Sequence, residues 1–157
     1  MSLSAQLDQT DWKILRELQS SGRITNVELA SRIGLSPPPC LRRVQALERS
    51  GVISGYRATL DSARLGYDVA VFAFVRLRSQ SESELKAFEN LVAGWPQVRE
   101  AYAVSGEADY LLKLVARVLP ELQSFIIDRL TAAAPVAGVK TTLILRISKY
   151  QPGVPMP

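Results

Sequence analysis

Residues 25–50 read TNVELASRIGLSPPPCLRRVQALERS, and this stretch decides the fold of the N-terminal part of the chain. Thr25, followed three residues later by Glu28, forms a capping box that opens a short helix ending at Gly34. Ser36 is the expected N-cap of the next helix, because the three prolines after it fit a first turn whose amides lack intrahelical partners. Only three residues separate the two helices, so the stretch predicts a helix-turn-helix.

The second of these helices has two different faces. Its apolar side is predicted to carry Leu41, Val44, Leu47 and Glu48, while Arg43 flanks the exposed side. A helix-turn-helix places its second helix in the major groove of DNA, where arginine can bind guanine O6 and N7. The residues expected to contact DNA are Ser36, Pro38, Pro39, Arg42, Arg43, Gln45 and Arg49.

Positive charge is concentrated in the same region. The chain has 157 residues and a net charge of +4, and Arg32 to Arg57 holds five arginines against the single acid Glu48. This local excess favours a nucleic-acid partner, although a small helical bundle whose arginines form only a solvated face is the alternative.

Residues 1–60 form one predicted domain. Leu7 and Trp12 bracket Asp8 as a hydrophobic staple around an N-cap, so a first helix is expected from about residue 8 to residue 18. Residues 52–60 alternate between apolar and polar, which predicts a linker strand after the third helix.

Residues 61–157 form the second predicted domain. Strands are expected at 67–78, 98–104, 110–117 and 139–147, with one helix opening after Ser81 and another at Pro120. The order β-α-β-β-α-β is typical of the ferredoxin-like fold, an antiparallel sheet with both helices on one face. The first strand has apolar residues on both of its faces and is therefore expected to be buried on both sides. The whole chain is therefore α+β, and the apolar sheet face left uncovered predicts at least a homodimer.

Composition excludes several classes of protein. The chain has no histidine and one cysteine, which excludes histidine catalysis, mixed Cys/His zinc sites and internal disulfides. No apolar run approaches the roughly 20 residues that span a bilayer, so no membrane partner is expected. A small-molecule enzyme using Asp109, Glu107 and Glu100 remains an alternative, but no paired-carboxylate or metal spacing supports it. We expect no enzyme activity, no cofactor and a reducing cytoplasm.

The same residues resemble a known family. Leu35 to Leu41 followed by Arg42, Arg43 and Val44 is similar to the recognition-helix signature of the Lrp/AsnC (feast/famine) transcriptional regulators. The run Gly106 to Leu111 resembles the family's G-x-x-D-Y turn, and Thr142 to Arg146 resembles its last strand. The resemblance covers nearly the whole chain in matching order.

The resemblance implies more than the residues do alone. It implies a regulator that binds a palindromic operator in double-stranded DNA, forms homodimers that assemble to octamers, and senses an amino acid or related effector in a bacterial or archaeal cytoplasm, associated with the nucleoid. By position, the effector would meet Ser105, Gly106, Asp109 and Tyr110. Asp109 could accept from its ammonium group, whereas the alternative is that Gly106 only permits a turn and Asp109 only caps it. An architectural nucleoid protein with little sequence preference is the alternative to a specific regulator.

Overall fold

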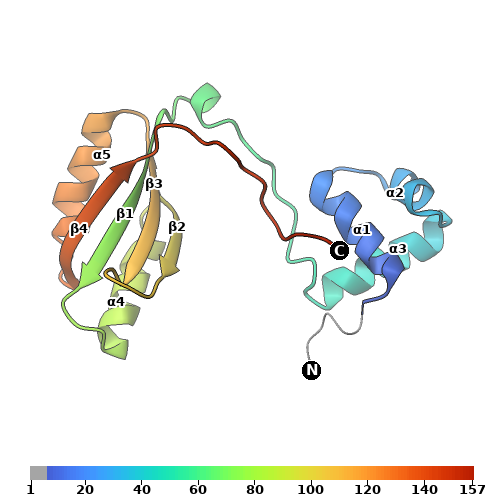
Figure 1. The fold of residues 1–157 in the computed structure, drawn as a ribbon, viewed down its shortest axis with the longest axis horizontal. Helices are drawn as coiled ribbons and strands as arrows, with labels where there is room; N and C mark the ends of the chain where they lie inside the picture. The colour runs from blue at the N-terminus through green and yellow to red at the C-terminus, as the bar shows by residue number, and fades with distance from the viewer. Residues whose placement is uncertain (1–6) are drawn as a thin grey trace. The chain divides into compact units, whose positions relative to one another are not determined.

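The computed structural model describes residues 7–157, which form two compact units (Figure 1). The helical unit combines the described residues up to Thr59 with Tyr150–Pro157, and the sheet unit is Leu60–Lys149. Each unit has its own hydrophobic core and is described by itself. Within residues 7–157 no helix has the length and apolar character needed to cross a membrane.

The helical unit contains α1 (Gln9–Ser20), α2 (Asn26–Ile33) and α3 (Pro37–Arg49). Asp8 caps α1: its carboxylate accepts from the Asp11 amide, and the Asp11 carboxylate accepts from the Asp8 amide. This reciprocal box satisfies two amides that the helix itself leaves unpaired. Thr25 caps α2 by accepting from the Glu28 amide, so the predicted starts of both helices are confirmed.

The core of the helical unit draws on all three helices. Its buried members are Ile14, Leu15, Leu29, Ala30, Ile33, Cys40 and Leu47. On α3 the inward residues are Cys40, Val44 and Leu47, whose spacings of four and three place them on one side of the helix. The predicted apolar side was wrong in two members: Leu41 is 45% exposed and Glu48 is also exposed.

The linker strand predicted for residues 52–60 is not formed. The segment is turn and irregular backbone, in which Val52 and Ile53 pack against the helical core and the Tyr56 hydroxyl donates to Glu48 Oε1 at 2.9 Å. Alternation predicts which side chains turn inward, but a strand also needs a neighbour to pair its backbone groups. None of the four strands of the described sheet pairs with this segment.

The sheet unit follows the predicted β-α-β-β-α-β order. Its elements are β1 (Val69–Leu77), α4 (Glu82–Ala93), β2 (Val98–Ala103), β3 (Tyr110–Ala116), α5 (Leu119–Phe125) and β4 (Val136–Leu143). The strands lie in the order β2-β3-β1-β4, and all neighbours are antiparallel. One wide helical turn, Ile126–Thr131, continues α5. The fold is the predicted ferredoxin-like one, although the last strand begins and ends earlier than expected.

One face of the sheet carries the core, and the other face is open. Phe88 of α4 and Leu122 and Phe125 of α5 pack with the inward side chains of β1 and β3. The expectation that the first strand is buried on both sides was wrong for this chain: Phe74 and Arg76 point to the other face and are exposed. Because both helices cover the same face, alternate residues of β1 are left without cover.

Residues 150–157 belong with the helical unit, although the division expected at residue 60 placed them in the second domain. Met156 packs against the helical core, which explains the grouping. The helical unit is therefore built from two separate parts of the chain.

Candidate functional site

The turn between α2 and α3 brings a proline-rich helix start to the surface. Gly34 adopts φ +75°, a left-handed conformation that glycine takes without steric cost, and its amide donates back to α2. The Asn26 side chain donates to the Pro37 carbonyl at 2.8 Å and so fixes the start of α3 against α2. Ser36 occupies the N-cap position, but its side chain makes no capping hydrogen bond and is exposed.

The outer face of α3 carries most of the residues predicted to contact DNA. Pro38, Arg42, Gln45 and Arg49 are exposed, Pro39 is half-buried, and the exposed Leu41 lies among them. Among residues 7–157, neither Arg42 nor Arg49 forms an ion pair with a carboxylate. Both guanidinium groups are therefore available to an anionic partner.

Arg43 has a different position. At 3.6 residues per turn it lies about 160° around the helix from Gln45, on the side facing α1. Its Nη1 lies 2.8 Å from Asp8 Oδ2 and 2.8 Å from Asp11 Oδ1, so both members of the α1 capping box bind it. The Asp11 amide and then Arg43 lower the pKa of Asp8, and the two carboxylates raise the pKa of Arg43. The structure thus places Arg43 between two helices and not on the outer face.

Arg32 is neutralised in a similar way. Its guanidinium group contacts Glu17 Oε2 of α1 at 2.9 Å and Glu28 Oε1 of α2 at 2.6 Å. Two of the five arginines between Arg32 and Arg57 therefore bind carboxylates of their own unit. The charge that faces outward is smaller than the sequence count, and it is concentrated on α3.

In the sheet unit, the predicted effector residues do not lie together. The turn between β2 and β3 is closed by hydrogen bonds from the Val104 amide to the Asp109 carbonyl and from the Asp109 amide to the Val75 carbonyl. Gly106 adopts φ +128°, which few residues other than glycine can take. The Asp109 carboxylate accepts from the Leu77 amide and from Gln80 Nε2, each at 2.7 Å, so it holds the end of β1.

Tyr110 lies on the opposite face of the sheet from Ser105. It is 4% exposed, its ring centroid is 4.8 Å from that of Phe88, and its hydroxyl donates to Glu89 Oε1 at 2.8 Å. Burial and the neighbouring Glu89 raise the pKa of Tyr110 to about 12. This tyrosine is part of the core beneath α4.

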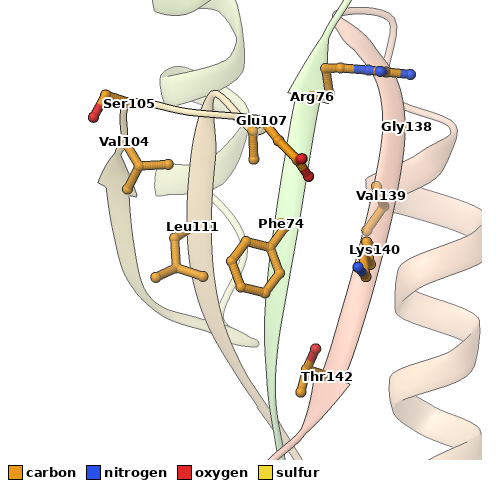
Figure 2. Close-up of a pocket in the computed structure, with 11 residues that line it drawn as sticks. Phe74, Arg76, Val104, Ser105, Glu107, Leu111, Gly138, Val139, Lys140 and Thr142 are labelled. Carbon is orange, nitrogen blue, oxygen red and sulfur yellow. The ribbon is translucent and has the colours of Figure 1, made fainter.

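A cavity of about 720 Å³ lies on the open face, beside the β2–β3 turn (Figure 2). Its lining residues are Phe74, Arg76, Val104, Ser105, Glu107, Ala108, Leu111, Gly138, Val139, Lys140 and Thr142. Strand register explains the arrangement, because Phe74 pairs with Leu111 on one side and with Lys140 on the other. These three side chains therefore form one row across the sheet.

The cavity combines cations, one acid and an apolar floor. Arg76 pairs with Gly138 across the strands, and the absence of a side chain there leaves room for the guanidinium group, as Figure 2 shows. Glu107 reaches over the sheet from the turn, while Lys140 stands on β4. Within residues 7–157, Arg76, Lys140 and Glu107 form no ion pair with one another. A carboxylate and an ammonium group could each find an opposite charge here.

Of the predicted effector residues, only Ser105 lines this cavity. Arg76, Lys140 and Glu107 also line the cavity, and none of them was predicted as an effector residue. The alternation of Phe72, Phe74 and Arg76 along one strand face was the available signal, but the register with β4 was needed to add Lys140. Residues 7–157 contain no group of three acidic or cysteine side chains placed to hold a metal ion.

Comparison with known proteins agrees with both units. Residues 7–54 match a family model described as a winged helix-turn-helix DNA-binding domain, and residues 70–154 match one described as an Lrp/AsnC ligand-binding domain. A leucine-responsive regulatory protein of Rhizobium meliloti is 56% identical over 93% of this chain and 94% of its own length. The Bkd operon transcriptional regulator of Pseudomonas aeruginosa is 41% identical over 90% and 93%.

Solved structures show the same likeness. A transcriptional regulator of Neisseria meningitidis, crystallised as a complex with L-Met, has a TM-score of 0.91 at 36% identity and covers 95% of this chain and 96% of its own. An AsnC family regulator of Agrobacterium tumefaciens has a TM-score of 0.89 at 36% identity, covering 95% and 97%.

Proposed function

Since this chain belongs to the Lrp/AsnC family of transcriptional regulators, we propose that it is a sequence-specific regulator that binds a palindromic operator and responds to an amino acid. The observation that carries the proposal is the outer face of α3, where Arg42 and Arg49 are exposed and bind no carboxylate among residues 7–157. Such a regulator works on the chromosome, in the cytoplasm and associated with the nucleoid.

The DNA contacts divide by chemistry. Arg42, Gln45 and Arg49 can reach base edges or phosphates from the outer face of α3, and the exposed start of the helix at Ser36 and Pro38 approaches the backbone, with Pro39 behind them. Arg43 would have to leave two carboxylates to reach DNA, so we assign it to holding α3 against α1.

The effector site is the cavity on the open sheet face. Arg76 and Lys140 would bind the carboxylate of an amino acid, Glu107 its ammonium group, and Phe74 and Leu111 an apolar side chain. Ser105 and Gly106 shape the mouth of the cavity, and Asp109 and Tyr110 support the turn from behind. The name of the R. meliloti relative and the L-Met bound to the N. meningitidis regulator favour an apolar amino acid.

The open face also supports assembly with a second copy of the chain. On this face Phe74 is 39% exposed, Tyr102 51% and Val104 37%, which is a large apolar surface for a chain that works alone. Acidic and basic groups lie on the same face, so a symmetry-related copy can pair Glu107 with Arg76 or Lys140. Homodimers formed in this way would assemble further to octamers, and an effector in the cavity would shift the balance between assembly states.

Two measurements test the proposal. Selection from random duplexes should yield one palindromic site bound about 10³-fold or more tightly than other DNA at the same salt concentration. A ratio near one would favour the alternative, an architectural protein without sequence preference.

The effector is tested by thermal shift of the full-length protein against the twenty amino acids. A ligand at about 100 times its Kd should add about 2.7 kcal/mol to the free energy of unfolding. Arg76→Ala and Lys140→Ala should remove the shift, whereas the control Lys86→Ala, on the exposed surface of α4, should keep it. Equal shifts in all three variants would place the effector elsewhere.

A further inference from the structure

A groove on the helical unit is bounded on one side by a distant part of the same chain. It lies between α1 and the segment 52–56, with a volume of about 480 Å³. From the helical side it is lined by Leu7, Trp12, Leu15, Leu18, Gln19, Val52, Ile53, Ser54, Gly55 and Tyr56. The residues that complete its wall are Gly153, Val154 and Met156, from the segment that follows the sheet unit.

One side chain binds both backbone groups of the incoming segment. Gln19 Nε2 donates to the Val154 carbonyl at 2.8 Å, and the Val154 amide donates to Gln19 Oε1 at 3.1 Å. A carboxamide carries both donor and acceptor atoms, so it pairs the N–H and the C=O of this one residue as a neighbouring strand would. One turn away on α1, the Arg16 guanidinium group donates to the Pro157 carbonyl, and Met156 packs against the helical core.

Gly153 makes this close approach possible. Its φ is +101°, and a Cβ placed on it would lie 2.3 Å from Gln19 Oε1 and 2.5 Å from Gln19 Cδ. Gln19 could make room for a larger residue only by turning away, which would break both of its hydrogen bonds to Val154. The fit between this helix and this segment therefore depends on a glycine at one position and a carboxamide at the other.

We propose that residues 150–157 form a strap, docked in cis on α1, that completes the DNA-binding unit and gives it a second covalent connection to the sheet unit. The first connection is the chain around Thr59 and Leu60, and the second is the chain around Lys149 and Tyr150. Strand β4 supplies Lys140 and Thr142 to the ligand cavity, and the strap begins eight residues after Thr142.

Hydrogen exchange of full-length variants tests the docking. Gly153→Val and Gln19→Ala should speed exchange of the amides in the last turn of α1 by roughly tenfold, the effect of losing about two net hydrogen bonds. The matched control is Gln151→Ala, the same change at an exposed strap residue whose side chain forms no hydrogen bond within residues 7–157. Alanine favours helix more than glutamine does, so a purely local effect of Gln19→Ala would slow exchange instead. Exchange equal to the control in both strap variants would overturn the proposal.

Trp12 gives a second readout, because it lines the same groove as the strap. In a Trp95→Phe background, its emission should shift to longer wavelength in Gly153→Val and stay unchanged in Gln151→Ala. An unchanged spectrum in Gly153→Val would contradict the docking.

Cross-linking separates docking in cis from exchange between two copies. Cysteines introduced as Ser54→Cys and Val154→Cys, which line the same groove and leave Gln19 intact, are joined with a short bis-maleimide, while Cys40 is buried and does not compete. A covalent monomer of altered mobility on a denaturing gel supports the strap in cis. A covalent dimer, or no cross-link although both thiols react with N-ethylmaleimide, overturns it. The two single-cysteine variants are the controls.

Discussion

Replacing Arg42 with alanine should weaken DNA binding and flatten its dependence on salt, whereas replacing Arg43 should change mainly the stability of the helical unit. The difference follows from their partners: Arg42 is exposed with no carboxylate bound to it among residues 7–157, while Arg43 Nη1 lies 2.8 Å from Asp8 and 2.8 Å from Asp11. An arginine that contacts a DNA phosphate releases counterions from the DNA, whereas an arginine that binds carboxylates of its own protein does not.

The size of each effect can be worked out. Each lost phosphate contact reduces the magnitude of the slope of log K against log salt by about 0.9. A dimer on a palindrome loses one contact from each of its two recognition helices, so the slope changes by about 1.8 in total. At 0.1 M salt, Arg42→Ala should then bind about 60-fold more weakly. Arg43 is 38% exposed and its ion pairs are screened by water, so Arg43→Ala should reduce the free energy of unfolding by about 1 kcal/mol.

Fluorescence anisotropy between about 50 and 200 mM salt would measure both slopes on one selected operator. Lys13→Ala is the control, because it removes an exposed positive charge from α1, outside the outer face of α3. A slope reduced as much in Arg43→Ala as in Arg42→Ala would show that Arg43 leaves its carboxylates and contacts DNA, which would refute the assignment.

Three further predictions concern the ion pair of Asp8, the hydroxyl of Tyr110 and the carboxylate of Asp109. The pKa of Asp8 is lowered by the Asp11 amide and by Arg43, so its contribution to stability is present above the unfolded pKa of 3.8 and is lost as pH falls through the folded value. The melting temperature of Asp8→Asn should therefore decrease less than that of the parent protein when the pH is lowered from about 5 to about 3. The pKa of Tyr110 is raised to about 12, so this phenol should ionise at higher pH than a free tyrosine in an ultraviolet titration. Its contribution to the free energy of unfolding is present below about pH 10 and is lost as pH rises toward 12. Tyr110→Phe loses the hydrogen bond to Glu89 and should reduce the free energy of unfolding in denaturant by about 1 kcal/mol. Asp109→Ala should cost about 2 kcal/mol or more because two donors lose a charged acceptor, and a normal unfolding midpoint would contradict the structural role assigned to this carboxylate.

The features that could be predicted from the sequence are those set by residues close together in the chain. The N-caps at Asp8 and Thr25 and the left-handed Gly34 depend on contacts within about three residues and are found where they were predicted, although the capping box predicted at Thr25 shows only the bond from the Glu28 amide. The order of elements in the sheet unit follows from strand alternation and from helix starts at Ser81 and Pro120, which are equally local.

The features that could not be predicted depend on partners far apart in the chain. Arg43 was expected on the exposed side because a helical wheel does not reveal that two acids more than thirty residues earlier meet it. Tyr110 was expected at the effector site because of its place in a motif, but strand parity turns it toward α4. Lys140 joins the cavity only through its register with Phe74, which no local pattern contains.

The strap also has a consequence for the order of synthesis. The sheet unit, Leu60–Lys149, contains ninety residues, and all of them are translated before Tyr150. Translation proceeds at about 5–20 residues per second. Roughly 5–18 seconds therefore separate the synthesis of Thr59, where the first part of the helical unit ends, from the synthesis of Tyr150, where the strap begins. A translation product that stops within the sheet unit would carry the recognition helix without its support. Every chain with a complete helical unit would thus also carry a complete sheet unit.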